Sequence, residues 1–163
     1  GSTGIGYGDG DDATVLSDMR GSYASVYLRR KFEVADPGAI DSLILEAAYD
    51  DGFVAYLNGV EVARRNAPAG TPTFTTAASL ARADQQAVVF ETINISSFKQ
   101  HLVNGPNVLA VHGLNIAAND SDFFIEAKLD AYSVGEGELL DQSAIVNARA
   151  LKNGEWSALT SMS

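Results

Sequence analysis

The chain has 163 residues, of which 46% are hydrophobic and 20% charged, a composition typical of one globular domain and not of a disordered chain. Its formal net charge of −10 repels phosphate groups, so neither nucleic acid nor an anionic membrane is expected as a partner. No cysteine is present, which excludes disulfides, thiolate zinc sites and cysteine nucleophiles.

The opening residues and the apolar runs bear on targeting. No apolar run is long enough to span a bilayer, so no membrane insertion is expected. The opening "GSTGIG" lacks the basic and apolar regions of a signal peptide, and we interpret residues 1–3 as an expression scar.

Short alternating segments separated by turn residues recur along the chain, whereas helix-period segments are scarce. In "LILEAAYD", for example, Leu43, Leu45 and Ala47 share one face. The clearest element is a hairpin over 52–66, in which Asn58-Gly59 supplies the positive φ angles of a type I′ turn. We predict further strands over 24–34, 39–50, 85–95, 107–116 and 121–134, a serine-capped helical turn within 96–105, and an irregular connection over 67–84.

This series of strands predicts an all-β fold, an antiparallel β-sandwich over residues 4–134. A Gly/Glu-rich linker is expected at 135–139. Residues 140–163 contain a second Asn-Gly turn, which predicts a C-terminal hairpin. That hairpin is either a fragment of a neighbouring Ig-like module or a final hairpin that docks on the sandwich.

Several phrases carry a family resemblance over residues 4–130: "GIGYGDGDDATVL", "LILEAAYDDGFVAYLNGVEVARRNAPAG", "VNGPNVLAVHGLN" and "SDFFIEAKL". They resemble galactose-binding-like jelly-roll modules of large secreted bacterial proteins, which are similar to the sugar-binding domain of β-galactosidases. The resemblance implies a jelly-roll topology, a lectin-like ligand (a polysaccharide or oligosaccharide), and a secreted or cell-surface location in bacteria. It also implies a monomeric module beside other domains of a parent chain.

Two acidic stretches are candidate sites for a structural Ca²⁺. Asp9, Asp11 and Asp12 are spaced by glycine and can turn oxygen ligands toward one hard cation, although the spacing is not that of an EF-hand. Asp50 and Asp51 are adjacent carboxylates that repel each other unless a cation, an arginine or backbone amides compensate. The alternative at 9–12 is a solvated acidic turn. The alternatives at 50–51 are a hairpin-entry turn held by Arg64, Arg65 or amides, and direct contact with a sugar. We rank 9–12 as the better calcium site.

A sugar site needs aromatic faces and planar polar groups at strand ends and loops. The loop "GLNIAANDSDFF" concentrates both kinds of side chain. The full set of candidate ligand-binding residues is Tyr7, Arg65, Asn66, Asn115, Asn119 and Asp122, with Tyr23, Phe74 and Phe123 as further aromatics.

No catalytic constellation stands out. The two histidines, His101 and His112, have no zinc-site spacing, and His112 on an apolar strand is expected to be packed. The sequence contains no GxSxG or P-loop motif, and nothing singles out two carboxylates as a glycosidase pair. The leading hypothesis is a non-catalytic carbohydrate-binding accessory module, and the alternative is a structural or protein-docking β-sandwich of a multi-domain surface protein.

Overall fold

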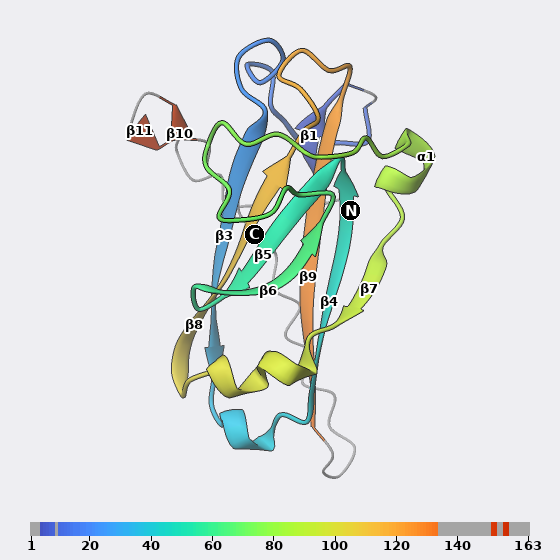
Figure 1. Ribbon diagram of the computed structural model, residues 1–163. Helices are drawn as coiled ribbons and strands as arrows, with labels where there is room; N and C mark the ends of the chain where they lie inside the picture. The colour runs from blue at the N-terminus through green and yellow to red at the C-terminus, as the bar shows by residue number, and fades with distance from the viewer. Residues whose placement is uncertain (1–3, 9, 134–150, 153–154, 157–163) are drawn as a thin grey trace.

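The computed structural model describes residues 4–8, 10–133, 151–152 and 155–156, and it shows an all-β sandwich, as predicted (Figure 1). One sheet has five strands in the order β2-β1-β9-β4-β7, and the other has four in the order β3-β8-β5-β6. The strands of the five-stranded sheet are β1 (Ile5–Tyr7), β2 (Thr14–Val15), β4 (Ser42–Asp50), β7 (Glu91–Asn94) and β9 (Phe123–Tyr132). Those of the four-stranded sheet are β3 (Ser25–Val34), β5 (Gly52–Leu57), β6 (Val60–Arg65) and β8 (Gly105–Leu114).

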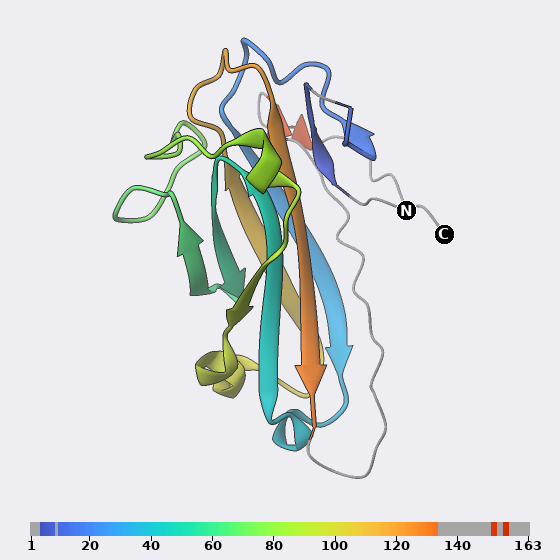
Figure 2. The same cartoon turned by 90° about the vertical axis from the view of Figure 1, so that its right-hand side faces the viewer.

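The core lies between the two sheets, which form two layers when seen from the side of β7 (Figure 2). The predicted alternation along β4 is confirmed, because Leu43, Leu45 and Ala47 are each at most 1% exposed. Phe53 and Leu57 face them from β5 and are fully buried. The inward residues of both sheets thus form one continuous apolar core, which is what holds the sandwich together.

The β5–β6 hairpin forms as predicted. Asn58 and Gly59 have φ angles of 50° and 85°, the left-handed pair that a type I′ turn requires. Gly52, at the start of β5, lies so close to β6 that a Cβ atom would sit 2.8 Å from the carbonyl oxygens of Arg65 and Asn66. Only glycine fits there, which explains why the acidic pair is followed by glycine.

Two predicted elements differ from the structure. The strand expected over 85–95 begins instead as the short helix α1 (Asp84–Ala87), and only β7 (Glu91–Asn94) pairs with β4. The helical turn over 96–105 is the 3₁₀ helix η2 (Ser96–His101), but the expected serine cap is wrong because the Ser96 hydroxyl accepts the backbone N–H of Leu43. In both places a tertiary contact to β4 replaces the local pattern.

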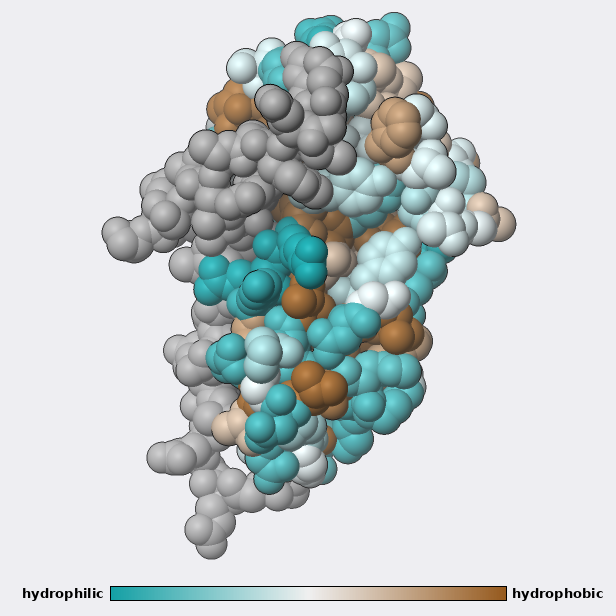
Figure 3. Space-filling model, turned by 90° about the vertical axis from the view of Figure 1, so that its left-hand side faces the viewer, coloured by the Kyte–Doolittle hydropathy of each residue, from teal (hydrophilic) through white to brown (hydrophobic). Residues whose placement is uncertain are grey.

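The loops gather at the two ends of the sandwich. A second 3₁₀ helix, η1 (Pro37–Ala39), lies with η2 at one end, whereas α1 and the β8–β9 loop lie at the other (Figure 1). Residues 66–83 run without regular structure between β6 and α1, as predicted for this connection. Seen from the side of β3 and β8, the surface mixes hydrophobic and hydrophilic side chains (Figure 3).

In the predicted C-terminal hairpin, β10 (Leu151–Lys152) pairs antiparallel with β11 (Glu155–Trp156). The linker at 135–139 and the rest of 140–163 lie outside the described residues. None of the described helices is long and apolar enough to cross a membrane.

Candidate functional site: an acidic cluster beside an open hollow

The two adjacent aspartates at the end of β4 have different roles. Asp51 is 2% exposed, and its carboxylate accepts the backbone N–H groups of Arg82 at 2.7 Å and Ile116 at 2.6 Å. Its backbone oxygen accepts the side-chain amide of Asn66 at 2.9 Å. Asp51 therefore fastens both the 66–83 connection and the β8–β9 loop to the start of the hairpin, which is the amide-held turn that the sequence offered as one alternative.

The other alternative, arginine compensation, is wrong. Arg64 pairs with Glu61 at 2.8 Å, and Arg65 pairs with Glu91 at 2.6 Å. Both arginines lie on β6, and each forms its ion pair with a glutamate and not with Asp50 or Asp51.

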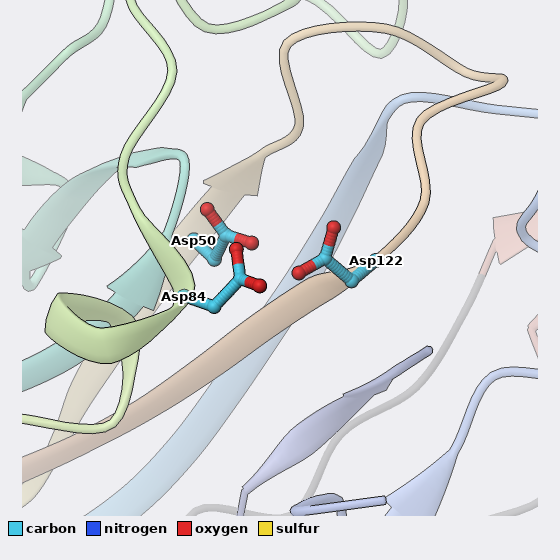
Figure 4. A group of neighbouring side chains, drawn as sticks. All are labelled: Asp50, Asp84 and Asp122. Carbon is cyan, nitrogen blue, oxygen red and sulfur yellow. The ribbon is translucent and has the colours of Figure 1, made fainter. Parts of the chain in front are cut away.

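Besides the neighbouring carboxyl of Asp51, Asp50 meets two other carboxylates. It pairs with Phe124 across the β4–β9 ladder, so Asp122, two residues earlier, lies on the same face as its diagonal neighbour. Asp84 reaches the same point from the first residue of α1. The three side chains point toward one another (Figure 4), and each offers a carboxylate oxygen within 4.8 Å of the others.

The position of Asp50 is electrostatically unfavourable for an anion. The side chain is 4% exposed, and its Oδ1 has no hydrogen-bond partner among the described residues. Burial, followed by the nearby carboxyls of Asp51 and Asp122, raises the pKa of Asp50 to about 9. In the absence of a bound cation, Asp50 is therefore protonated at neutral pH.

The described part of the glycine-spaced stretch, residues 10–12, shows no such group of carboxylates. Asp9 lies outside the described residues. Asp11 and Asp12 are half-buried, and Asp12 lies against the backbone of Gly6. Among the described residues, neither belongs to a group of three potential metal ligands, whereas Asp50 does.

Four of the six predicted ligand-binding residues lie together at the β8–β9 loop, namely Tyr7, Asn115, Asn119 and Asp122. Tyr7 and Asn115 are buried, and they bond to each other at 3.1 Å. The Asn115 amide also donates to the backbone oxygen of Asp122 at 2.8 Å, so Asn115 helps to hold the β8–β9 loop. Asn119 is exposed on that loop. Of the further aromatics, Phe123 belongs to the core, Tyr23 donates its hydroxyl to Asp18, and Phe74 is exposed.

An open hollow of about 520 Å³ lies where the 66–83 connection and α1 meet β4 and β7. It is lined by Tyr49, Asn66, Ala81, Arg82, Gln86, Val89 and Glu91. Of the predicted ligand-binding residues, Asn66 lines this hollow. Arg65 is not in the lining, but it forms an ion pair with Glu91, which is.

The polar lining of the hollow is held in place by a network. The Arg82 guanidinium lies 3.8 Å from the centroid of the Tyr49 ring and covers it. The Tyr49 hydroxyl donates to Glu91 at 2.9 Å, and Arg65 donates to the same carboxylate at 2.7 Å. Although burial raises the pKa of Glu91, the bonds from Arg65 and Tyr49 outweigh it and hold the pKa below its usual value. Glu91 is therefore ionised, and its orientation is fixed.

His112 is packed, as expected. It is 2% exposed and stacks on Tyr27 with a centroid distance of 4.1 Å. Burial lowers the pKa of His112 to about 4, so it is neutral at pH 7.

The sequence did not identify Asp84, Arg82, Gln86 or Glu91 as site residues. All four lie in or next to the segment that looked like an ordinary connection and strand. The one available signal was the length of that connection, since long loops in compact domains are often functional.

A scan against protein-family models and a search of curated proteins find no match. Among solved structures, the chain is similar to an α-L-rhamnosidase of Streptomyces avermitilis complexed with L-rhamnose, with 20% identity over 69% of this chain and 9% of that one and a TM-score of 0.45. It is also similar to a native α-L-rhamnosidase from Aspergillus terreus, with 13% identity over 83% of this chain and 16% of that one and a TM-score of 0.44. The chain thus spans less than a fifth of either enzyme, and similarity of this degree carries no information about its ligand or activity.

Proposed function

We propose that this chain is a non-catalytic carbohydrate-binding module that holds a larger secreted or cell-surface protein near a glycan. The observation that carries the proposal is the open hollow with its planar polar lining. Its size lies within the range of small-ligand sites, about 300–1,000 Å³.

The lining suits hydroxyl groups better than it suits a flat apolar ligand. Asn66, Gln86 and Arg82 bring amide and guanidinium donors, and Glu91 brings a fixed acceptor. Tyr49 is only 4% exposed and is covered by Arg82, so it supports the polar groups and offers little ring surface for stacking. A short glycan or a chain end, bound through hydrogen bonds, is the ligand that fits such a surface.

Binding of this kind acts through effective concentration. A module with even modest affinity keeps its parent protein close to the polymer, which raises the local concentration of any linked domain. The proposal assigns no catalytic step to the chain itself.

We expect the protein to be retained on at least one plant, fungal or bacterial glycan in an array or affinity gel. Gln86→Ala should weaken that binding about ten-fold, because one side-chain hydrogen bond to a polar ligand is lost in a partly desolvated site. Gln86 is exposed, so its replacement should leave the melting temperature unchanged.

Gln100→Ala is the matched control. Gln100 is an exposed glutamine on η2, at the opposite end of the sandwich, and it lines a different hollow. The Gln100→Ala variant should bind glycan as tightly as the wild type does. Absence of retention on every glycan, or equal loss in the two variants, would contradict the proposal.

One observation favours a protein-docking role instead. Leu80, Val88 and Val89 lie close together in the chain around α1 and are 63%, 46% and 58% exposed. Exposed apolar side chains of this kind occur at protein interfaces. If docking is the function, Leu80→Ser should abolish association with a neighbouring domain of the parent chain, whereas Gln86→Ala should not.

A further inference from the structure

The acidic cluster contains an unpartnered buried oxygen, which distinguishes it from an ordinary group of surface acids. Asp50 is 4% exposed, and its Oδ1 has no donor among the described residues. A buried carboxylate oxygen without a donor is costly unless a proton or a cation satisfies it. The carboxylates of Asp84 and Asp122 lie beside this side chain (Figure 4), and the carboxyl of Asp51 is also in contact with it. A cation between Asp50, Asp84 and Asp122 would satisfy the unpartnered oxygen.

We propose that Asp50, Asp84 and Asp122 bind one hard divalent cation, with Ca²⁺ as the best fit. All three ligands are carboxylate oxygens, and the described part of the cluster includes no histidine, so zinc and copper are disfavoured. Calcium–oxygen distances of about 2.3–2.6 Å allow two ligand oxygens to lie up to about 5 Å apart. The observed limit of 4.8 Å falls within that span. Magnesium, at about 2.0–2.1 Å, requires ligand oxygens no more than about 4.2 Å apart and usually keeps several waters in place of carboxylates.

The arrangement is already fixed by contacts that need no cation. Asp51 binds the backbone of Arg82, two residues before Asp84, and that of Ile116, at the start of the β8–β9 loop. Asn115 binds the backbone of Asp122 from the other side. Two loops that are distant in sequence are thus held at the end of β4, and the entropic cost of gathering their carboxylates is met during folding.

Cation binding would also stabilise the neighbouring hollow. Asp84 directly follows residues 81–83, and Ala81, Arg82 and Gln86 all line the hollow. A cation that joins Asp84 to β4 and β9 would therefore restrict the segment that carries these side chains. The cation site itself does not depend on the proposed function, because it can be measured without any glycan.

The test uses the full chain, freed of metal with a chelator and titrated with Ca²⁺ to about 1 mM, in the affinity range of extracellular calcium modules, by calorimetry and by thermal shift. We expect one site per chain and a melting temperature that rises with Ca²⁺. Asp84→Asn should weaken binding at least ten-fold and leave the melting temperature in chelator unchanged, because Asp84 is exposed.

Asp11→Asn is the matched control, since it removes a carboxylate from the competing acidic stretch at 9–12 and should bind Ca²⁺ as the wild type does. Weakened Ca²⁺ binding in Asp84→Asn, together with unchanged Ca²⁺ binding in Asp11→Asn, supports the proposal. Any other result overturns it, including the absence of Ca²⁺ binding by the wild type, or weakened Ca²⁺ binding in Asp11→Asn but not in Asp84→Asn.

Discussion

Replacing Asp51 with alanine is expected to lower the free energy of unfolding by about 3–5 kcal/mol. The change leaves the backbone N–H groups of Arg82 and Ile116 without their acceptor, and each unsatisfied buried donor costs about 1–3 kcal/mol. It also releases the two loops that Asp51 ties to the hairpin. Equilibrium unfolding in urea, followed by circular dichroism, measures the difference.

Asp36→Ala is the control for this prediction. Asp36 also accepts a backbone N–H, that of Gly38 at 2.9 Å, but it is exposed at the start of η1. Its loss should cost only about 0.5–2 kcal/mol, the usual value of a helix cap. If Asp51→Ala costs no more than Asp36→Ala, Asp51 is not the structural anchor described above.

Replacing Asp50 with asparagine is expected to stabilise the chelator-treated protein at pH 8 by about 2 kcal/mol or more. At pH 8 the folded wild type buries Asp50 only by binding a proton that the unfolded chain does not hold, and the neutral amide removes that cost. It also provides its own N–H donors toward Asp84 and Asp122. A gain in stability from altering a buried acidic residue is unusual, which makes the result diagnostic.

The pH dependence gives the same prediction a second measurement. The pKa of Asp50 is raised from 3.8 to about 9 on folding. The folded state therefore holds a proton that the unfolded state has lost between these values, so the stability contributed by Asp50 is complete below about pH 4 and is lost as the pH rises to about 9. Without cation, the wild type should lose stability over this window relative to Asp50→Asn.

Calcium should reverse the order of the two proteins. The cation takes the place of the proton on Asp50, so at pH 8 the wild type gains stability with Ca²⁺ and Asp50→Asn gains little. The interpretation of Asp50 is contradicted if Asp50→Asn is less stable than the wild type in chelator. It is equally contradicted if the variant keeps the full response to Ca²⁺.

The hairpin shows how much of the fold local sequence determines. The Asn58-Gly59 turn and the alternation of β5 require only neighbouring residues, so both are visible in the sequence. The position of Gly52 follows from the same element, because β6 passes directly beside it. Elements stabilised by contacts distant in sequence, such as α1 and η2, were predicted with the wrong type or the wrong cap.

The acidic pair shows what local sequence cannot determine. The repulsion between Asp50 and Asp51 is evident from their adjacency, and the requirement for compensation is general. Which partner supplies it depends on where the 66–83 connection and the β8–β9 loop come together, and no local pattern encodes that. For the same reason Asp84 was not predicted as a site residue.

The hollow was missed for a related reason. Its lining combines a core tyrosine, a turn asparagine, a loop arginine and a strand glutamate, which only the tertiary structure brings together. Among the predicted residues, Asn66 lines the hollow, whereas Asn115 is buried and holds the β8–β9 loop.

The cation site can be tested directly with a crystal structure grown in calcium, in which the anomalous signal of the ion is measured. We expect one calcium peak bonded to carboxylate oxygens of Asp50, Asp84 and Asp122, with the carboxylate of Asp51 still bound to the backbone N–H groups of Arg82 and Ile116. A peak at Asp11 and Asp12 with none at Asp50 would contradict this expectation. So would a calcium-grown crystal that contains no ion between the three carboxylates.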